Sequence, residues 1–462
     1  MIIALIISKV AEKILHFFGR GATTLPGKIA LFIKKDILRK LSENVKVIII
    51  TGTNGKTTSA RMIEEGFKKS SKSYFINRSG ANLITGITTS FIVNSNVFGR
   101  CKKDYAIIEC DENALKKVSL YVDAEILLVT NVFRDQLDRY GEVSSTLSAI
   151  KIGAENMENC KLVLNADDPL TFSLSRLQNS YVTYGVNIPL KLGGKSDTEC
   201  CIFCKEPYKY KYKTYSQLGS FYCPNCLYKR ENPMFSADEI IESTADYSVV
   251  FANLNGKNSL LRINLGGVYN IYNSLGAAAV LSLLNIDNVT IENALSSFGG
   301  AFGRMENFGK TRMLLVKNPA GFTQTMNYIY PLEISNLIFV LNDKDADGTD
   351  VSWIWDAEIK ISEKVKNIYA FGVRSGDMAL RLKYEGYEPK IIDSYEEFYN
   401  LTDEENTVII PTYTAMMTLR PYLAKKHQKE EFWKWICELH TFIQICLIFM
   451  VILVTFCALK KD

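Results

Sequence analysis

A glycine-rich segment near the N-terminus has the residues needed to hold phosphate. It follows a β-branched run at 45–51 and reads Gly52-Thr53-Asn54-Gly55-Lys56-Thr57-Thr58. Backbone N–H groups and the start of a helix would face phosphate oxygens, Lys56 would supply positive charge, and the Thr57 hydroxyl could reach Mg²⁺. The general pattern expects a further Gly at position 50, where this chain has isoleucine, so the loop is a shorter form. The sequence therefore predicts a nucleotide-binding loop between a strand and a helix at 59–69.

Five of the eleven cysteines fall within the segment 200–226. Four of them form two C-x-x-C pairs, Cys201 with Cys204 and Cys223 with Cys226, separated by 18 residues. This spacing is typical of a zinc ribbon, and four thiolates close the coordination sphere of Zn²⁺, which makes the site structural. Two disulfides or a redox C-x-x-C are the alternatives, and Cys200 is expected to be a spectator.

The stretch between the two cysteine pairs alternates tyrosine and lysine over 208–213 and predicts a ribbon strand. Such a strand is able to bind single-stranded nucleic acid. A solvated hairpin face fits better, because 54 Lys and Arg nearly balance 50 Asp and Glu. No nucleic-acid partner is expected.

Histidine is almost absent from the body of the chain. The only three are His16, His427 and His440, so residues 17–426 contain no imidazole. A self-contained Ser-His-Asp or Cys-His centre is therefore excluded from this stretch.

Several domains must position these residues, since 462 residues exceed the usual size of one. The pattern of strands and helices predicts an α/β protein. We expect a helical N-terminal lead at 1–42, a central nucleotide-binding domain at 43–300 with the ribbon inserted at about 197–230, and a Rossmann-like C-terminal domain at 301–435. Strand-like runs at 337–341, 365–371 and 407–411 support the last of these.

Both ends of the chain are apolar. Residues 441–459 carry no charge and approach the length that spans a bilayer, which predicts a transmembrane tail anchor, with a buried helix as the alternative. More basic residues precede this segment than follow it, so the body is expected at the cytoplasmic face of the plasma membrane. Residues 1–17 have helical apolar spacing, which predicts an amphipathic helix packed on the body or lying on the membrane surface.

The phosphate-binding loop resembles the ATP loop of the Mur ligase family, whose members join amines to carboxylates through an acyl phosphate. Five further segments resemble that family in the same order, namely 107–112, 130–139, 165–169, 270–278 and 303–306. Within the family, three features resemble the MurT branch. They are the inserted four-cysteine ribbon, the segment 317–323, and the Asp- and Trp-rich segment 341–356.

The resemblance implies amidation of the D-glutamate α-carboxylate in the lipid II stem peptide, at the expense of ATP, during peptidoglycan synthesis. It places Lys56 at the β- and γ-phosphates and Thr57 with Glu109 at Mg²⁺. It places Asn270, Asn273 and Arg304 on the nucleotide side. The alternatives are a surface carboxylate for Glu109 and a helix-packing role for Asn273.

Glutaminases that release ammonia from glutamine use a Cys nucleophile activated by His. The body of this chain has no histidine for that role, so the nitrogen must come from another protein. The resemblance implies a heterodimer with a GatD-type glutaminase, in which Asp350 completes the partner's triad. Asp347 and Asp356 are the runners-up, and turn formation is the structural alternative for all three carboxylates.

Two other functions stay open from the sequence. One is a ligase that adds an amino acid to a peptide or folate, as other members of the family do. The other is a membrane-tethered nucleotide-binding module whose ribbon binds a partner without catalysis.

Overall fold

The computed structural model describes residues 1–17, 23–77, 80–134, 143–190, 192–299, 304–402 and 406–428. The predicted tail anchor at 441–459 lies outside these residues, as does the end of the expected C-terminal domain. Within the described ranges, no helix combines the length and the apolar character needed to cross a membrane.

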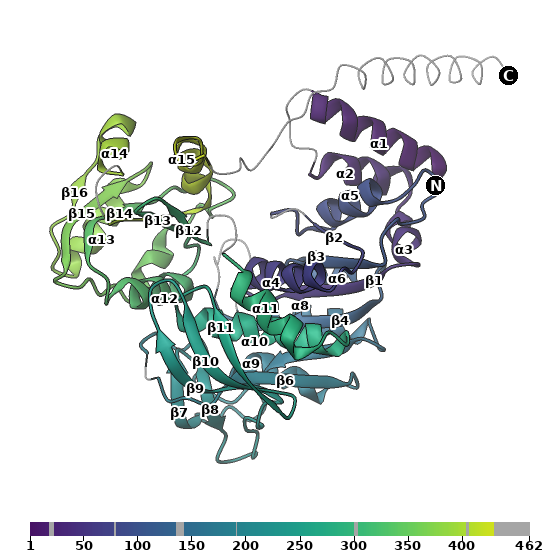
Figure 1. The fold of residues 1–462 in the computed structure, drawn as a ribbon, viewed down its shortest axis with the longest axis horizontal. Coiled ribbons are helices and arrows are strands. Elements are labelled where there is room, and N and C mark those ends of the chain that lie inside the picture. The colour runs from purple at the N-terminus through teal and green to yellow at the C-terminus, as the bar shows by residue number, and fades with distance from the viewer. Residues whose placement is uncertain are drawn as a thin grey trace.

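A nine-stranded sheet forms the centre of the larger part of the molecule (Figure 1). Its strands lie in the order β11-β10-β9-β6-β5-β4-β1-β3-β2. Their bounds are β1 (Lys46–Thr51), β2 (Tyr74–Ile76), β3 (Tyr105–Glu109), β4 (Ala124–Val129), β5 (Lys161–Asn165), β6 (Tyr181–Val186), β9 (Phe235–Ser243), β10 (Ser248–Leu254) and β11 (Lys257–Ile263). Within this sheet, neighbouring strands from β9 through β6, β5, β4, β1 and β3 to β2 are parallel. At the other edge, β10 is antiparallel to β9, and β11 is antiparallel to β10. The carboxyl ends of β1, β3, β4 and β5 therefore meet at one edge, where open α/β sheets bind ligands.

Helices cover both faces of this sheet. Alternate residues of β1 point to opposite faces, with Ile48 and Ile50 in one core cluster and Val47 and Ile49 in the other. The first face carries α4 (Lys56–Lys69), α10 (Val268–Leu283) and α11 (Asn288–Ser297). The second carries α5 (Ile84–Asn94), α6 (Glu112–Val118) and α8 (Val143–Glu155). Burial on both faces explains the uninterrupted apolar run of β1, which is typical of parallel sheets.

Three N-terminal helices add a further layer over α5. They are α1 (Ile2–Phe17), α2 (Leu25–Ile33) and α3 (Ile37–Ser42). Helix α1 packs against α2, and α2 packs against α5. Ala4 and Leu5 are fully buried. The N-terminal helix predicted from the apolar spacing is therefore present, and it packs on the body.

The cysteine-rich segment forms a small hairpin between β6 and β9. Its strands are β7 (Lys209–Tyr215) and β8 (Leu218–Tyr222), and the short helices α9 (Pro169–Phe172) and η1 (Ser173–Arg176) precede β6. Lys209, Lys211 and Lys213 are exposed along β7, while the residues between them are partly buried. The predicted ribbon strand with a solvated face is confirmed.

A second, six-stranded sheet forms the C-terminal part of the described chain. Its order is β12-β13-β17-β14-β15-β16, and only β12 is antiparallel. The strands are β12 (Arg304–Phe308), β13 (Thr311–Leu314), β14 (Ile334–Val340), β15 (Val365–Phe371), β16 (Lys390–Ile391) and β17 (Thr407–Pro411). The three strands expected from the sequence are therefore present in a largely parallel sheet.

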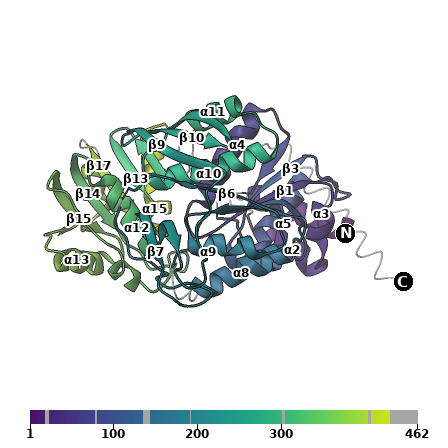
Figure 2. The ribbon, with the colours of Figure 1, turned by 90° about the horizontal axis from the view of Figure 1, so that it is seen from below.

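The second sheet is also covered on both faces. Leu337 and Phe339 face α12 (Pro319–Ile329), η2 (Ser352–Trp355) and α13 (Ser375–Tyr384). Ile338 and Val340 face α14 (Tyr395–Leu401) and α15 (Tyr413–Lys426). In both views of the ribbon this sheet lies to one side of the larger one (Figures 1 and 2). Helix α12 is placed toward the larger sheet.

Candidate functional site

The predicted phosphate-binding loop joins the carboxyl end of β1 to α4. Gly52 and Gly55 have φ values of 118° and 90°, which side chains rarely adopt. A Cβ atom on Gly55 would lie 2.1 Å from Asn273 Oδ1, and one on Gly52 would lie 2.3 Å from Thr130 Oγ1. Both positions therefore require glycine, for conformation and for space.

The remaining loop residues are held by the end of β4. Thr53 donates its backbone N–H to the Asn131 carbonyl (2.9 Å) and its hydroxyl to the Phe133 carbonyl (3.1 Å). Asn131 exchanges two bonds with the Asn54 backbone, at 2.9 and 3.0 Å. The loop is thus already shaped before a ligand binds, which lowers the cost of ordering it.

Lys56 is buried at the first turn of α4. Its ammonium donates to the carbonyls of Gly52 and Thr53 and to Glu112 Oε1, the last at 2.6 Å. Burial lowers the pKa of Lys56, but the charges of Glu112 and Glu109 raise the pKa more, so the ammonium stays charged. Glu112 ends the segment 107–112, and the sequence predicts no role for it. Its position in the first turn of α6, three residues after Glu109, was the available signal.

Thr57 and Glu109 lie together beside this lysine. The Thr57 hydroxyl donates to Glu109 Oε2 at 2.7 Å, and both side chains are buried. Asn77 Oδ1 accepts the Glu109 backbone N–H at 2.8 Å and fixes the end of β3. Glu109 is 7% exposed, so the alternative of a surface carboxylate is wrong. A hydroxyl and a carboxylate oxygen next to a phosphate site match the ligands that Mg²⁺ prefers.

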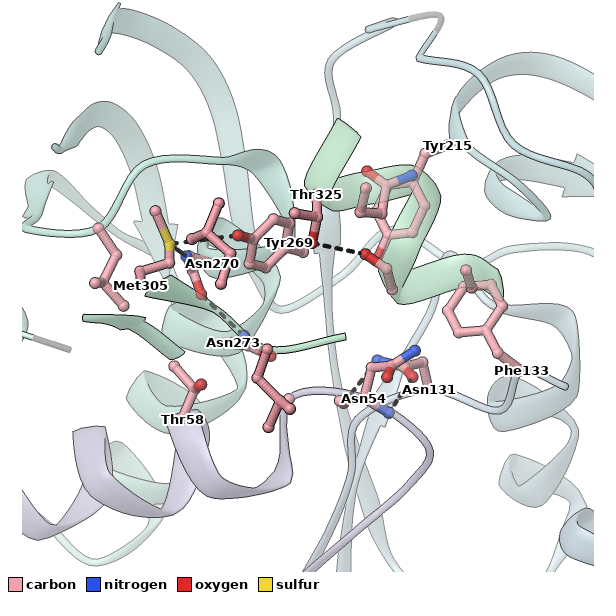
Figure 3. Close-up of a pocket in the computed structure, with 17 residues that line it drawn as sticks. Asn54, Thr58, Asn131, Phe133, Tyr215, Tyr269, Asn270, Asn273, Met305 and Thr325 are labelled. Atoms are coloured by element: carbon pink, nitrogen blue, oxygen red, sulfur yellow. Dashed lines mark hydrogen bonds between the residues drawn. The ribbon is translucent and has the colours of Figure 1, made fainter. Parts of the chain in front are cut away.

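The two predicted asparagines reach the loop from the first turns of α10. Asn273 donates to Asn270 Oδ1 at 3.2 Å, and Asn270 donates to the Gly266 carbonyl at 2.7 Å. Both line the same pocket as Asn54 and Thr58 (Figure 3). Asn273 therefore faces a pocket and does not serve packing alone. The side chain of Arg304 lies outside the described residues, although its backbone begins β12 and pairs with Leu314.

The pocket is closed on its other side by α12, so it lies between the two sheets. Asn318 caps α12 by accepting the Gly321 N–H at 2.8 Å, and its amide donates to Asn54 Oδ1 at 3.0 Å. Ala320, Gly321 and Gln324 line the pocket opposite the phosphate-binding loop. The segment 317–323 therefore connects the C-terminal domain directly to that loop.

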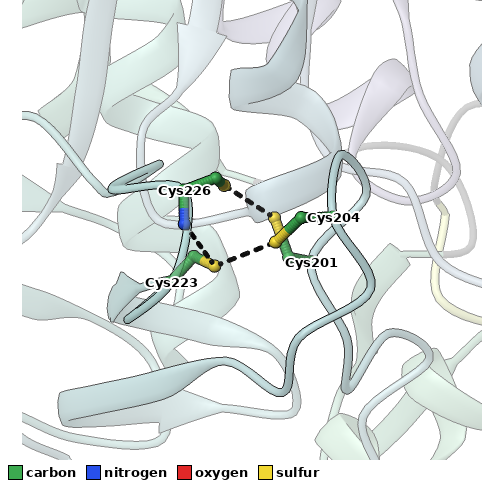
Figure 4. A group of neighbouring side chains, drawn as sticks. All are labelled: Cys201, Cys204, Cys223 and Cys226. Atoms are coloured by element: carbon green, nitrogen blue, oxygen red, sulfur yellow. Dashed lines mark hydrogen bonds between the residues drawn. The ribbon is translucent and has the colours of Figure 1, made fainter.

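The four predicted metal ligands converge in the hairpin segment (Figure 4). Their sulfur atoms all lie within 4.8 Å of one another. The pairs Cys201–Cys226 and Cys204–Cys223 are 3.5 and 3.4 Å apart. A Zn–S distance of about 2.3 Å in a tetrahedron requires sulfurs roughly 3.8 Å apart, so the donor set fits Zn²⁺. Cys200 is exposed and stands outside the group, as expected of a spectator.

The three candidate carboxylates of the segment 341–356 differ in their surroundings. Asp347 is 2% exposed, and its carboxylate accepts the backbone N–H and the hydroxyl of Thr414 at the start of α15. Asp356 is partly exposed and pairs with Arg134 at 3.4 Å. Asp350 is exposed and accepts the Ser352 N–H at 2.8 Å, and hydrogen bonds from Ser352 lower the pKa of its carboxyl. Asp347 therefore has a structural position, whereas Asp350 is open to a partner.

Comparison with protein families and curated proteins gives consistent matches. The model of the Mur ligase middle domain matches residues 50–227, and that of the MurT ligase C-terminal domain matches residues 315–416. The chain is 33% identical over 444 residues to a Streptococcus pneumoniae protein named lipid II isoglutaminyl synthase (glutamine-hydrolyzing) subunit MurT, covering 92% of this chain and 97% of that protein. The protein of the same name from Staphylococcus aureus is 34% identical over 442 residues, covering 92% and 98%.

Solved structures show the same fold at lower sequence identity. A type C pseudomurein peptide ligase from Methanothermus fervidus superposes with a TM-score of 0.64 at 21% identity, covering 85% of this chain and 80% of the ligase. MurF from Acinetobacter baumannii gives a TM-score of 0.63 at 16% identity, covering 87% and 81%.

Proposed function

The chain belongs to the MurT branch of the Mur ligase family, and from this we propose that it is the ATP-dependent synthetase subunit of a lipid II isoglutaminyl synthase. It amidates the α-carboxylate of D-glutamate in the lipid II stem peptide to D-isoglutamine, a step of peptidoglycan synthesis. The observation that carries this proposal is one-third identity to MurT subunits along almost their whole length. The amino-acid-adding alternative is not favoured by any feature of the described site.

The described residues support activation of a carboxylate by phosphoryl transfer. Lys56 moves from Glu112 to the β- and γ-phosphates and offsets the charge that develops there. Thr57 and Glu109 would hold Mg²⁺, which would supply positive charge beside the phosphates. The carboxylate attacks the γ-phosphorus, ADP leaves, and ammonia then displaces phosphate from the acyl phosphate. None of these steps requires an imidazole, which agrees with a body that contains no histidine.

Ammonia is expected to come from a glutaminase subunit that docks beside Asp350. Exposed apolar side chains flank this loop, namely Trp355 on η2 and Val373, Leu380 and Tyr384 on or next to α13. The Trp355 and Tyr384 rings meet edge to face with centroids 5.3 Å apart. Aromatic side chains of this kind are enriched at binding hot spots.

The function is tested with the purified chain, ATP, Mg²⁺ and lipid II. Ammonium at high concentration should support formation of D-isoglutamine, detected by mass spectrometry, whereas glutamine should not until a glutaminase subunit is added. Turnover of glutamine by the chain alone would refute the division of labour.

We also propose that the four cysteines bind one structural Zn²⁺. Metal analysis of the wild-type chain should give one zinc per chain, and Cys204→Ser or Cys223→Ser should lose the metal and unfold the ribbon. Cys200→Ser is the matched control, because this exposed neighbour stands outside the cluster and its loss should leave the zinc content unchanged. A wild-type chain without zinc would contradict the proposal.

We propose that the enzyme works at the cytoplasmic face of the plasma membrane, where a lipid-linked substrate would be found. Two features support this proposal, the uncharged segment 441–459 and the exposed Ile3 and Phe32 of the N-terminal helices, with exposed Phe98 in the turn after α5. After lysis without detergent, the full chain should sediment with membranes, and recovery in the soluble fraction would argue against it.

A further inference from the structure

The tip of the four-cysteine hairpin reaches the pocket beside the phosphate-binding loop. Tyr215, the last residue of β7, lines this pocket together with Asn54 and Asn273 (Figure 3). Its ring stacks on Phe133 at 6.1 Å between centroids and meets Tyr272 edge to face at 5.8 Å. A side chain from the inserted ribbon is therefore part of a pocket whose other walls come from the ligase body.

A network of hydrogen bonds fixes the hairpin tip to the elements that hold the nucleotide. Gln217 donates to the Val132 carbonyl at 3.0 Å, next to the residues that shape the phosphate-binding loop. The hydroxyls of Thr214 and Tyr272 lie 2.8 Å apart, and Tyr272 stands between Asn270 and Asn273 on α10. The position of Tyr215 is thus coupled to both sides of the pocket.

Asp167 joins the far end of the ribbon to the same network. It accepts hydrogen bonds from Arg230 Nε and from the Tyr272 hydroxyl, both at 2.6 Å. Arg230 follows the last cysteine of the ribbon, Cys226, by four residues. The base of the ribbon is consequently fixed by the bond of Arg230 to Asp167 in addition to the four sulfurs.

The pocket lies on the side of the loop away from the metal-binding groups. Asn54, Gly55 and Thr58 line it, whereas Lys56, Thr57 and Glu109 do not. A nucleotide whose phosphates lie over the loop, with Mg²⁺ at Thr57 and Glu109, therefore extends its nucleoside into this pocket. Aromatic side chains there offer a stacking surface for a base.

Gln324 supplies a polar group to the same pocket from α12. It is 6% exposed, and its Nε2 has no hydrogen-bond partner among the residues that the structure describes. An unpaired buried amide is costly unless a ligand satisfies it. A side-chain amide donates and accepts at once, which matches the edge of a purine.

We propose that the zinc ribbon is part of the nucleotide site, with the base of ATP packed against Tyr215 and its polar edge bound by Gln324. This inference rests on the proposed ATP-dependent function and adds to it the residues that recognise the nucleoside. It also gives the ribbon a task beyond its own stability, since the metal site holds the strand that carries Tyr215.

The test compares Mg²⁺-ADP with Mg²⁺-tripolyphosphate, which has phosphates but no base, by titration calorimetry on the full chain. Tyr215→Ala should weaken ADP binding about ten-fold or more, the range of a lost base–aromatic stack. Gln324→Leu should weaken it several-fold. Tripolyphosphate affinity should stay within two-fold of wild type for both variants. Tyr222→Ala, an exposed tyrosine of β8, is the matched control and should change neither affinity.

Two variants separate a loss of nucleotide binding from a loss of folding. Tyr215→Phe retains the ring and should bind ADP nearly as wild type, and Gln324→Leu lies outside the ribbon altogether. Unchanged ADP affinity in Tyr215→Ala and Gln324→Leu, or an equal loss of ADP and tripolyphosphate affinity, would overturn the inference. A wild-type chain that binds neither ligand would instead count against the proposed function.

Discussion

Lys56→Ala is expected to lower the rate of ATP-dependent amidation by about a thousand-fold, the effect of removing one preorganised group that stabilises transition-state charge. Lys56 is buried at the start of α4 and stays charged, because the charges of Glu112 and Glu109 raise its pKa more than burial lowers it. No other lysine or arginine lies in the loop 52–58. The measurement is ammonia-dependent formation of D-isoglutamine, followed together with ADP release.

A control is needed because Lys56 also neutralises Glu112, which is 3% exposed. Removing one member of a buried ion pair commonly costs about 3–5 kcal/mol of stability. Burial already raises the pKa of Glu112, so partial protonation will reduce that cost. The double variant Lys56→Ala/Glu112→Gln removes the unpaired carboxylate and should recover the melting temperature without recovering turnover. Recovery of both would mean that Lys56 acts only through stability.

The sequence predicted the parts of the site that depend on local order along the chain. A strand, a glycine loop and a helix at 45–69 define a phosphate site wherever they occur, and the structure has β1, the loop and α4 in those places. Asn270 and Asn273 were assigned through the family resemblance, and the structure has them one turn apart on α10, where both line the pocket beside the loop. The four cysteines could also be assigned from local order, because each C-x-x-C pair brings two ligands together within four residues.

Features that depend on distant contacts were not predictable. Glu112, which is 56 residues from Lys56 in sequence, is identified as its partner only when β3 lies beside β1. Tyr215 follows the alternating run 208–213 and had no predicted role, yet the end of β7 places it in the pocket beside the phosphate-binding loop. The resemblance selected Asp350, but the residue types alone do not separate it from Asp347 in an Asp-rich loop. The structure separates them, because Thr414 at the start of α15 binds Asp347. In each case the prediction would have needed contacts between residues that are distant in sequence.

Asp350→Asn is expected to separate the two nitrogen sources. In a complex with its glutaminase, the variant should keep ammonia-dependent amidation and lose glutamine-dependent amidation by about a thousand-fold or more, the scale on which the third member of a nucleophile–His–Asp triad acts. Asp350 is exposed on a loop after β14, and hydrogen bonds from Ser352 hold the pKa of its carboxyl below the ordinary value. It is therefore ionised at neutral pH and able to orient an imidazole of the partner and to stabilise the imidazolium.

Two neighbouring carboxylates provide matched controls for this experiment. Asp356→Asn alters a partly exposed residue six positions away that pairs with Arg134, and it should leave both activities near wild type. Asp347→Asn alters a buried residue that binds Thr414, so it should lower thermal stability and both activities together. Only a group that acts through the glutaminase changes the ratio of the two activities. Equal loss with ammonia and with glutamine in Asp350→Asn would therefore place Asp350 with the structural carboxylates and leave the partner's triad to be completed by another residue.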